Sequence, residues 1–558
     1  MQLDPVEYAI LSQSVIAAAR EMGVKLIRSA YSTILREARD GSAALLDAAG
    51  GTVAQAELIP MQLGSIGRVF QPCAAMFPAA TLEEGDFLVI NDPYSGGQHL
   101  QDVFFFHPVF FEGAVIGFAA SVAHHLDIGG GSPGLNAGAR DLYAEGLIIP
   151  PMKVNMARDW YGADGQGGGF QRLLRANVRV PQQTMGDFDA QIAANAIGVL
   201  RMQELARRYG VAKLRATMAG LQDYSERRMR AAISAVPDGT YHGEASLDTD
   251  GLGSGKVTVR AAVTVAGDGI TVDFAGTDPQ VGTNLNAPFA SVISASVSCL
   301  KAALTSPDIP FNDGSLRPIT VTAPPGCLLN PRHPAPVRAR MLSTSRAWNA
   351  VMMAIAQAVP EKVIAQGYDT TTAFCLSWLS PVSGWSVYLE VYGGGYGAGL
   401  GNDGCDAVDN PLSNCSNTPV EAMDQDFSFF RVLDYALRPD SCGSGARRGG
   451  LGFSRSYAIL VDGPLVSHYS DRFTGQASGI FGGGPGASGR CEVLRDGKVI
   501  SLRSQDSFGL QRGDVVTISL GGGGGYGKPA ERPAALVAHD LADGVISAAR
   551  AEAWAAQG

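Results

Sequence analysis

The chain lacks the features that mark a secreted, membrane-embedded or disulfide-stabilised protein. Its eight cysteines are scattered and include no C-x-x-C pair, which is typical of reduced, mostly structural thiols. The first residues form neither the basic region nor the apolar region of a secretory signal peptide, and no apolar run approaches the length of a membrane span. We therefore expect a cytoplasmic protein that does not act at a membrane.

A basic surface is also missing. The formal net charge is −10, and no basic stripe offsets the repulsion from the phosphates of a nucleic acid. This argues against a nucleic-acid-binding protein. Hydrophobic residues at 46% and charged residues at 17% describe an ordinary globular chain, and 558 residues predict two or three domains.

Two glycine motifs resemble nucleotide sites, but neither is complete. Residues 484–489 match G-x-G-x-x-G, yet Cys491-Glu492-Val493-Leu494 predicts a strand where a dinucleotide site needs a helix. Residues 251–257 resemble a phosphate loop, but the glycine spacing is one residue short and Val257 replaces the hydroxyl that binds magnesium. We predict that this chain does not bind ATP.

The pattern along the chain predicts separate helical and strand-rich segments. Asp4 and Pro5 are typical of a helix start, and the helix should run toward Gly23, followed by a second helix from Leu26 to Tyr31. A hairpin pattern covers residues 43–51. Further helices are expected over residues 187–236 with a break at Gly210, 340–358 and 536–556, and alternating strands over residues 240–274.

These segments predict an α+β fold with a mixed multi-domain architecture. Helices dominate the N-terminal and central segments, and the C-terminal half is rich in glycine and strands. The glycines, 70 in all, predict tight turns and close-packed loops. The expected division is a metal-site region (1–185), a helical plus strand middle region (186–380), a glycine-rich β region (381–535) and a C-terminal helical tail (536–558).

Three of the eight histidines, His99, His124 and His125, fall in the two short segments 98–102 and 124–130, beside two aspartates. His99 and Asp102, three residues apart, can converge from a helical turn or a tight loop. The apolar run 116–123 predicts a buried strand that delivers His124 to the same point, and His125 should face the opposite way. Imidazole and carboxylate ligands suit zinc, manganese or iron, with an open position for an activated water. The alternative is a plain hydrogen-bonded His–Asp pair.

Many ordered sequence blocks make the chain resemble the hydantoinase B/5-oxoprolinase-like family, which also includes the α-type subunits of acetone and acetophenone carboxylases. The resemblance runs nearly end to end. The blocks include Arg39-Asp40-Gly41-Ser42, Asn91-Asp92-Pro93-Tyr94, Gly97-Gln98-His99-Leu100-Gln101-Asp102, Ala123-His124-His125-Leu126-Asp127, Glu145-Gly146, Pro334-Ala335-Pro336-Val337-Arg338-Ala339-Arg340 and residues 521–527.

The resemblance implies a metal-bearing B-type subunit of an ATP-dependent cyclic amide hydrolase. A hydantoinase A-like partner, in an A2B2 hetero-oligomer, would bind ATP and phosphorylate the substrate's amide or carbonyl oxygen, and this chain would then open the ring at a divalent metal. The implied ligands are His99, Asp102 and His124, with Asp40 as the fourth. One departure is Gln62, where many relatives have a histidine.

Weaker roles follow from the mechanism that the resemblance implies. His125 or Asp127 could relay protons as catalytic groups. Asn91, Arg39 and Lys153 could bind the substrate, and Arg36, Arg39 or Lys153 could hold its phosphate; the alternative for each is an ordinary ion pair or a solvated group. Two other functions remain open: a subunit of an ATP-dependent ketone carboxylase, favoured less because such chains are longer, and a non-catalytic scaffold subunit.

Overall fold

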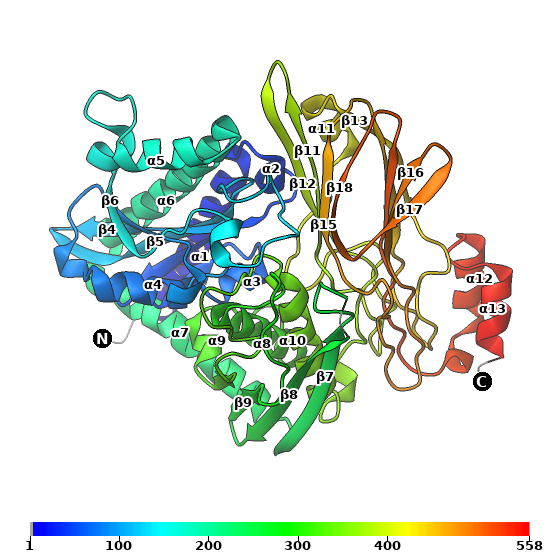
Figure 1. Cartoon of the computed structure of the whole chain (residues 1–558). Helices are drawn as coiled ribbons and strands as arrows, with labels where there is room; N and C mark the ends of the chain where they lie inside the picture. The colour runs from blue at the N-terminus through cyan, green and yellow to red at the C-terminus, as the bar shows by residue number, and fades with distance from the viewer. Residues whose placement is uncertain (1–3, 254, 557–558) are drawn as a thin grey trace.

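The computed structural model describes residues 4–253 and 255–556. Within them, four β-sheets and their covering helices form three adjoining parts (Figure 1). The N-terminal part, blue to cyan, lies on the left of that view, the middle part, green, lies below, and the C-terminal part, yellow to orange, lies on the right. The predicted α+β class is confirmed.

The N-terminal part is built on a six-stranded sheet in the order β2-β1-β5-β4-β3-β6. Two long helices, α1 and α6, pack against one face of this sheet and against each other. The strands are β1 (Gly41–Asp47), β2 (Thr52–Gln55), β3 (Asp86–Ile90), β4 (Asp102–Phe111), β5 (Ala114–His124) and β6 (Met152–Asn155). The helices are α1 (Pro5–Ser29), α2 (Thr33–Arg36), α3 (Pro60–Leu63), α4 (Ile66–Met76), α5 (Gly169–Asn177), α6 (Pro181–Tyr209) and α7 (Val211–Ile233).

The first helix begins as predicted but is longer. The Asp4 carboxylate accepts a hydrogen bond from the Glu7 N–H at 3.1 Å, and the helix then runs unbroken through Gly23 to Ser29. The prediction of two helices was wrong. A Cβ on Gly23 would lie 2.5 Å from the Cβ of Ala56, so this glycine permits close packing and does not end the helix.

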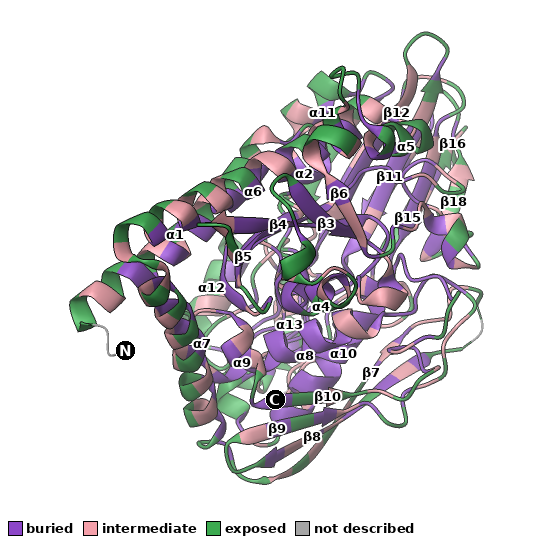
Figure 2. Ribbon diagram, turned by 90° about the vertical axis from the view of Figure 1, so that its left-hand side faces the viewer, coloured by how far each residue is buried: buried purple, intermediate pink, exposed green. Residues whose placement is uncertain are grey.

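The middle part combines a four-stranded sheet, in the order β10-β9-β8-β7, with the helices α8 and α10. The predicted break at Gly210 is confirmed, because α6 ends and α7 begins on either side of it. In Figure 2, α8 and α10 are largely buried, whereas α7 exposes its outer face. The elements are β7 (Gly239–Leu247), β8 (Val257–Ala266), β9 (Gly269–Asp273), β10 (Ile319–Thr322), α8 (Phe289–Leu304), α9 (Asp313–Leu316) and α10 (Arg340–Ile355).

The C-terminal part contains two sheets, ordered β12-β11-β15-β18 and β13-β14-β19-β16-β17. The strand β16 follows residues 484–489 directly, as predicted, and residues 251–257 lie mostly between β7 and β8, with Ser254 outside the described residues. The strands are β11 (Thr372–Ser380), β12 (Gly384–Tyr392), β13 (Phe430–Leu437), β14 (Phe453–Ile459), β15 (Leu465–Tyr469), β16 (Arg490–Arg495), β17 (Lys498–Leu502), β18 (Gln505–Gly509) and β19 (Val515–Ser519), and the helices are α11 (Val420–Asp426), α12 (Ala534–Ala542) and α13 (Ala548–Ala555).

The glycines of residues 521–525 form the centre of a bundle of loops below these sheets. A Cβ on Gly523 would lie 1.9 Å from the carbonyl oxygen of Tyr396, and one on Gly525 would lie 1.9 Å from that of Ser444. Both residues have ordinary backbone angles, since neither has a positive φ. Glycine is therefore needed here because neighbouring backbones touch, not because the chain turns.

The predicted domain boundaries do not follow these parts. The boundary at residues 185 and 186 falls inside α6, whose Phe188 and Gln191 pack on the N-terminal sheet. The boundary at residues 380 and 381 divides the hairpin of β11 and β12, and the one at residues 535 and 536 falls inside α12. Each boundary therefore divides a helix or a hairpin of the structure.

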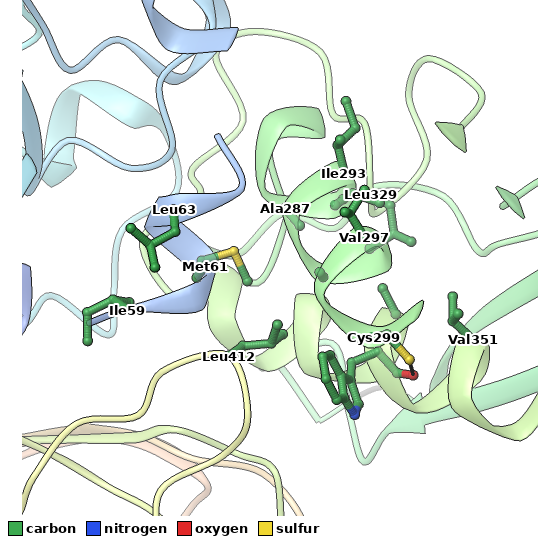
Figure 3. Close-up of a cluster of buried hydrophobic side chains, with 14 of the residues drawn as sticks. Ile59, Met61, Leu63, Ala287, Ile293, Val297, Cys299, Leu329, Val351 and Leu412 are labelled. Carbon is green, nitrogen blue, oxygen red and sulfur yellow. Dashed lines mark hydrogen bonds between the residues drawn. The ribbon is translucent and has the colours of Figure 1, made fainter. Parts of the chain in front are cut away.

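The three parts meet at a buried apolar cluster. Figure 3 shows Met61 of α3 directed toward α8, with Leu412 of the C-terminal part below it. The Met61 N–H also donates to the Leu412 carbonyl at 2.9 Å. This contact places the start of α3 beside both of the other parts.

All eight cysteines are free thiols, and seven of them are buried. In the described ranges, none of the helices combines the length and the apolar character that crossing a bilayer requires.

Candidate metal centre

Three neighbouring strands place two aspartates and a histidine at one end of the N-terminal sheet. Asp102, the first residue of β4, is the direct antiparallel partner of His124, the last residue of β5. Asp40 immediately precedes β1, which pairs with the other side of β5, and the His124 N–H donates to the Asp40 carbonyl at 3.0 Å. Strand register therefore brings together residues that are far apart in the sequence.

His99 joins this group from a turn. The Asp102 N–H donates to the His99 carbonyl at 3.0 Å, which folds the imidazole back over the aspartate. The Nε2 atom of His99 lies 3.2 Å from Asp102 Oδ1 and 3.2 Å from His124 Nδ1, and the last two atoms are 3.6 Å apart. The predicted convergence of the three side chains is confirmed.

These spacings fit a divalent ion. Ligand atoms about 2.0–2.1 Å from a tetrahedrally coordinated ion lie about 3.3 Å from one another. The three distances of 3.2 to 3.6 Å match that value without any movement of the side chains. Two imidazoles and one carboxylate suit zinc, manganese or iron.

His99 has a fixed tautomer. Its Nδ1 atom lies 3.1 Å from the carbonyl oxygen of Arg338, which can only accept a hydrogen bond, so Nδ1 carries the proton. The lone pair of Nε2 then faces the cluster, as a metal ligand requires. Burial, together with the charge of Arg340, lowers the pKa of His99 to about 3, so the ring is neutral at physiological pH.

Arg340 is a functional neighbour that sequence reasoning did not identify. Its Nη2 atom donates to Asp102 Oδ2 at 2.5 Å and to Gln98 Oε1 at 2.7 Å. Burial alone would raise the pKa of Asp102, but the positive charge of Arg340 holds it well below its usual range. Asp102 is therefore ionised, with one oxygen facing the cluster and the other held by the guanidinium.

Gln62 lies between the two carboxylates. Its amide Nε2 donates to Asp40 Oδ1 at 3.0 Å and to Asp102 Oδ1 at 3.4 Å, and its Oε1 accepts from the Ser42 hydroxyl at 2.9 Å. Asp40 Oδ2 is 3.6 Å from His124 Nδ1, at the edge of the cluster. Burial raises the pKa of Asp40 to about 6, and Asp102 adds to this effect.

A cavity of about 60 Å³ opens beside the cluster. Its walls come from all three parts of the chain and are mostly apolar. The lining includes Ile34, Ile59, Leu135, Leu342, Leu389, Val391 and Tyr469, and the polar side chains of Asp40, Gln62, His99, His124, Arg338 and Arg340. A small organic ligand in this cavity would touch the candidate metal site.

The structure does not bring His125 and Asp127 to the cluster. His125 faces the opposite side of the sheet, as predicted, where its ring stacks on Phe188 with centroids 3.7 Å apart and its Nε2 bonds Gln191. Asp127 accepts from the backbone N–H groups of Gly129 and Arg179. Both side chains therefore contact the scaffold in this structure, and their proton-relay roles remain predictions.

The residues predicted to contact the substrate also lie elsewhere. Asn91 is fully buried and bonds the backbone of Leu100, Leu147 and Ile149. Lys153 pairs with Asp86, and Arg36 pairs with Glu37 and Asp426. Arg39 is exposed. None of them lines the cavity, because each is engaged in holding a loop or faces solvent.

Comparison with known proteins identifies similar chains. The hydantoinase B/oxoprolinase family model matches residues 4–529. A putative B-type subunit of a D-/L-hydantoinase from Pseudomonas sp. (strain NS671) is 35% identical and covers 99% of this chain and 94% of its own length. The 5-oxoprolinase of Dictyostelium discoideum is 31% identical over 94% of this chain, which corresponds to 40% of that protein.

Two solved structures share the fold. The crystal structure of the ATP-dependent caprolactamase from Pseudomonas jessenii superposes with a TM-score of 0.88 at 29% identity, covering 99% of this chain and 96% of that chain. A nucleotide-free acetone carboxylase structure superposes with a TM-score of 0.87 at 19% identity, covering 99% and 79%. The second likeness concerns the fold alone.

Proposed function

Because this chain belongs to the hydantoinase B/oxoprolinase family, we propose that it is the B-type subunit of an ATP-dependent cyclic amide hydrolase. The observation that carries this proposal is the convergence of His99 Nε2, His124 Nδ1 and Asp102 Oδ1 on one point beside a mostly apolar cavity. The substrate is a small cyclic amide, such as a hydantoin, an oxoproline or a lactam.

His99, His124 and Asp102 would hold a zinc, manganese or iron ion, with Asp40 as the fourth ligand. A bound ion would polarise an oxygen attached to the carbon under attack and would lower the pKa of a water molecule. Arg340 and Gln62 fix the position of the Asp102 carboxylate through its two oxygens. The apolar wall limits the access of bulk water to the substrate.

The ATP-dependent step belongs to a partner subunit of the A type. A cyclic amide resists hydrolysis because its carbonyl is stabilised by resonance, and phosphorylating the oxygen converts it into a leaving group. Neither glycine motif of this chain is a complete nucleotide site. The match to only 40% of the Dictyostelium 5-oxoprolinase leaves room in that protein for an ATP-binding portion, which here would be a separate chain in an A2B2 assembly.

The variant Asp102→Asn tests this assignment in the complex with the partner. Asparagine keeps the side-chain shape but removes the charge that binds the metal. The complex should still consume ATP and phosphorylate the substrate, but ring-opened product should fall by at least a hundredfold. ATP turnover by this chain alone, or bicarbonate-dependent formation of a carboxylated ketone, would overturn the proposal.

A further inference from the structure

Arg338 lines the cavity together with residues of the candidate metal site. It precedes α10 by two residues, and its carbonyl is the acceptor for His99. Glu145 holds this segment from behind, since its two oxygens accept from the backbone N–H groups of Val337 and Arg338 at 3.0 and 2.9 Å. The backbone of Arg338 is thus fixed on both sides. The residue as a whole is only 6% exposed.

Two donor atoms of the Arg338 guanidinium, Nε and Nη2, have no hydrogen-bond partner. Nε and Nη2 are both buried and make no hydrogen bond, and Arg338 forms no ion pair with any described residue. The charge of Arg338 acts on the carboxyl group of Glu145, but both oxygens of that group accept hydrogen bonds from backbone N–H groups. A buried cation left in this state is costly unless something pairs with it.

The two free donors lie on the same edge of the guanidinium, where they match two oxygens of one anion. Arg495 shows the filled arrangement in this chain: its Nε and Nη2 donate to the two oxygens of Asp514 at 2.9 and 2.6 Å. Several other arginines have one buried donor without a partner, but among the described residues only Arg338 has this pair. Such an edge is the arrangement that proteins use for carboxylate and phosphate groups.

The charge of Arg338 acts on groups of the cavity wall. Burial raises the pKa of Tyr469, which lines the cavity with Arg338, and the pKa of Cys375 in the adjacent strand β11. The charge of Arg338 lowers both pKa values. Apolar side chains such as Ile34, Leu135 and Leu342 cover the rest of the wall. A ligand that fits would have a small apolar ring and one anionic group.

We propose that Arg338 binds an oxyanion of the ligand in this cavity through its Nε–Nη2 edge. This inference rests on the proposed function and narrows its substrate class. The oxyanion comes either from a carboxylate carried by the cyclic amide or from the phosphoryl group that the partner adds. Arg340 holds Asp102 at the metal side, so the two arginines have separate tasks.

Calorimetric binding to the full chain tests the proposal with three probes: 5-oxoproline, 2-pyrrolidinone and inorganic phosphate. The first two share a five-membered lactam ring and differ in the carboxylate. If the carboxylate is the partner, 5-oxoproline should bind roughly ten- to a hundredfold more tightly than 2-pyrrolidinone, as hydrogen bonds to a charged group predict. In Arg338→Gln this difference should disappear, and Arg338→Lys should restore part of it.

The phosphate arm identifies the other source. Phosphate binding that is lost in Arg338→Gln, with equal binding of the two lactams, assigns the edge to the phosphoryl group. The exposed Arg332→Gln serves as the matched control and should bind all probes like the wild type. Unchanged binding of every probe by Arg338→Gln overturns the proposal. If that variant does not fold, equal lactam affinities and no phosphate binding in the wild type overturn it instead.

Turnover separates this result from the proposed function. With the partner and ATP present, ring opening by the wild type that is unaffected in Arg338→Gln contradicts the anion site and leaves the hydrolase intact. Conversely, binding of 5-oxoproline that depends on Arg338, without ring opening of any cyclic amide, supports the anion site and contradicts the hydrolase.

Discussion

The Nδ1 atom of His99 and the carbonyl oxygen of Arg338 lie 3.1 Å apart, and this hydrogen bond joins the candidate metal site to the segment that precedes α10. One residue thereby has two tasks, because its backbone orients a candidate metal ligand while its side chain lies in the cavity wall. A shift of this segment would move both sites together. Arg338 therefore couples the candidate metal site to the cavity.

The first prediction concerns the metal itself. The purified wild-type chain should contain close to one equivalent of zinc, manganese or iron, and His99→Ala and His124→Ala should each lose most of it, because each removes one of three converging ligands. Elemental analysis measures this directly. The control is His539→Ala, on the exposed face of α12, which should keep the full complement. Full metal in both cluster variants contradicts the assignment.

Gln62→Leu should weaken metal binding without removing a ligand. The leucine keeps much of the volume but removes the amide that donates to Asp40 and Asp102. Loss of such an outer contact lowers metal affinity by about 10- to 100-fold. Competition with a chelator gives the affinity, and Gln71→Leu on the surface of α4 is the matched control. An affinity equal to that of the wild type would show that Gln62 does not orient the carboxylates.

Glu145 should make stability depend on pH. Burial raises its pKa to about 7, whereas an unfolded glutamate titrates near 4.3. Between these values the folded chain holds a proton that the unfolded chain has released, so the free energy of unfolding falls as the pH rises through this window. Glu145→Gln removes this fall but loses one acceptor for a backbone N–H, a loss that does not vary with pH.

The variant should therefore be less stable than the wild type at pH 5, and the gap should narrow by on the order of 3 kcal/mol by pH 8. Urea denaturation at the two pH values measures the gap. The exposed Glu552→Gln on α13 should show no such change. A gap that stays constant between pH 5 and 8 would contradict the raised pKa.

Gly523→Ala should destabilise the C-terminal part strongly. The added methyl would meet the backbone carbonyl of Tyr396 at 1.9 Å, and a backbone contact cannot be relieved by a rotamer change. We expect a loss of about 3 kcal/mol or more, the upper range for overpacking. Gly509→Ala in β18 has nothing within 4 Å of the new methyl and no positive φ, so its melting temperature should stay close to that of the wild type. Similar melting temperatures for both variants would contradict this packing.

The sequence predicted the parts of the site that depend on local pattern. His99 and Asp102 could be paired because three residues in a turn bring them together, and His124 because an apolar run predicts the strand that ends in it. Asp40 could be nominated only by resemblance, because its place depends on the pairing of β1 with β5. Spacing along the chain carries no information about which strands become neighbours.

Residues that depend on tertiary packing escaped the sequence analysis. Arg340 and Arg338 stand more than two hundred positions after the ligands and reach them only because the start of α10 and the segment before it lie beside His99 and Asp102. His125 and Asn91 have polar side chains in a suggestive block, yet their partners are backbone groups and Gln191. A polar residue near a motif can serve the scaffold, and the sequence alone does not separate these roles.

The glycine segment 521–525 also bears on how the chain folds. It lies at the centre of loops that include Tyr396, Ser444 and Ser478, all of which precede it. During synthesis these loops emerge before the segment that joins them, so their contacts have to wait for the last part of the chain. Contacts between distant positions slow folding, because a long loop must close before they form. A growing chain is therefore most prone to aggregation before residues 521–525 have made their contacts in the C-terminal part.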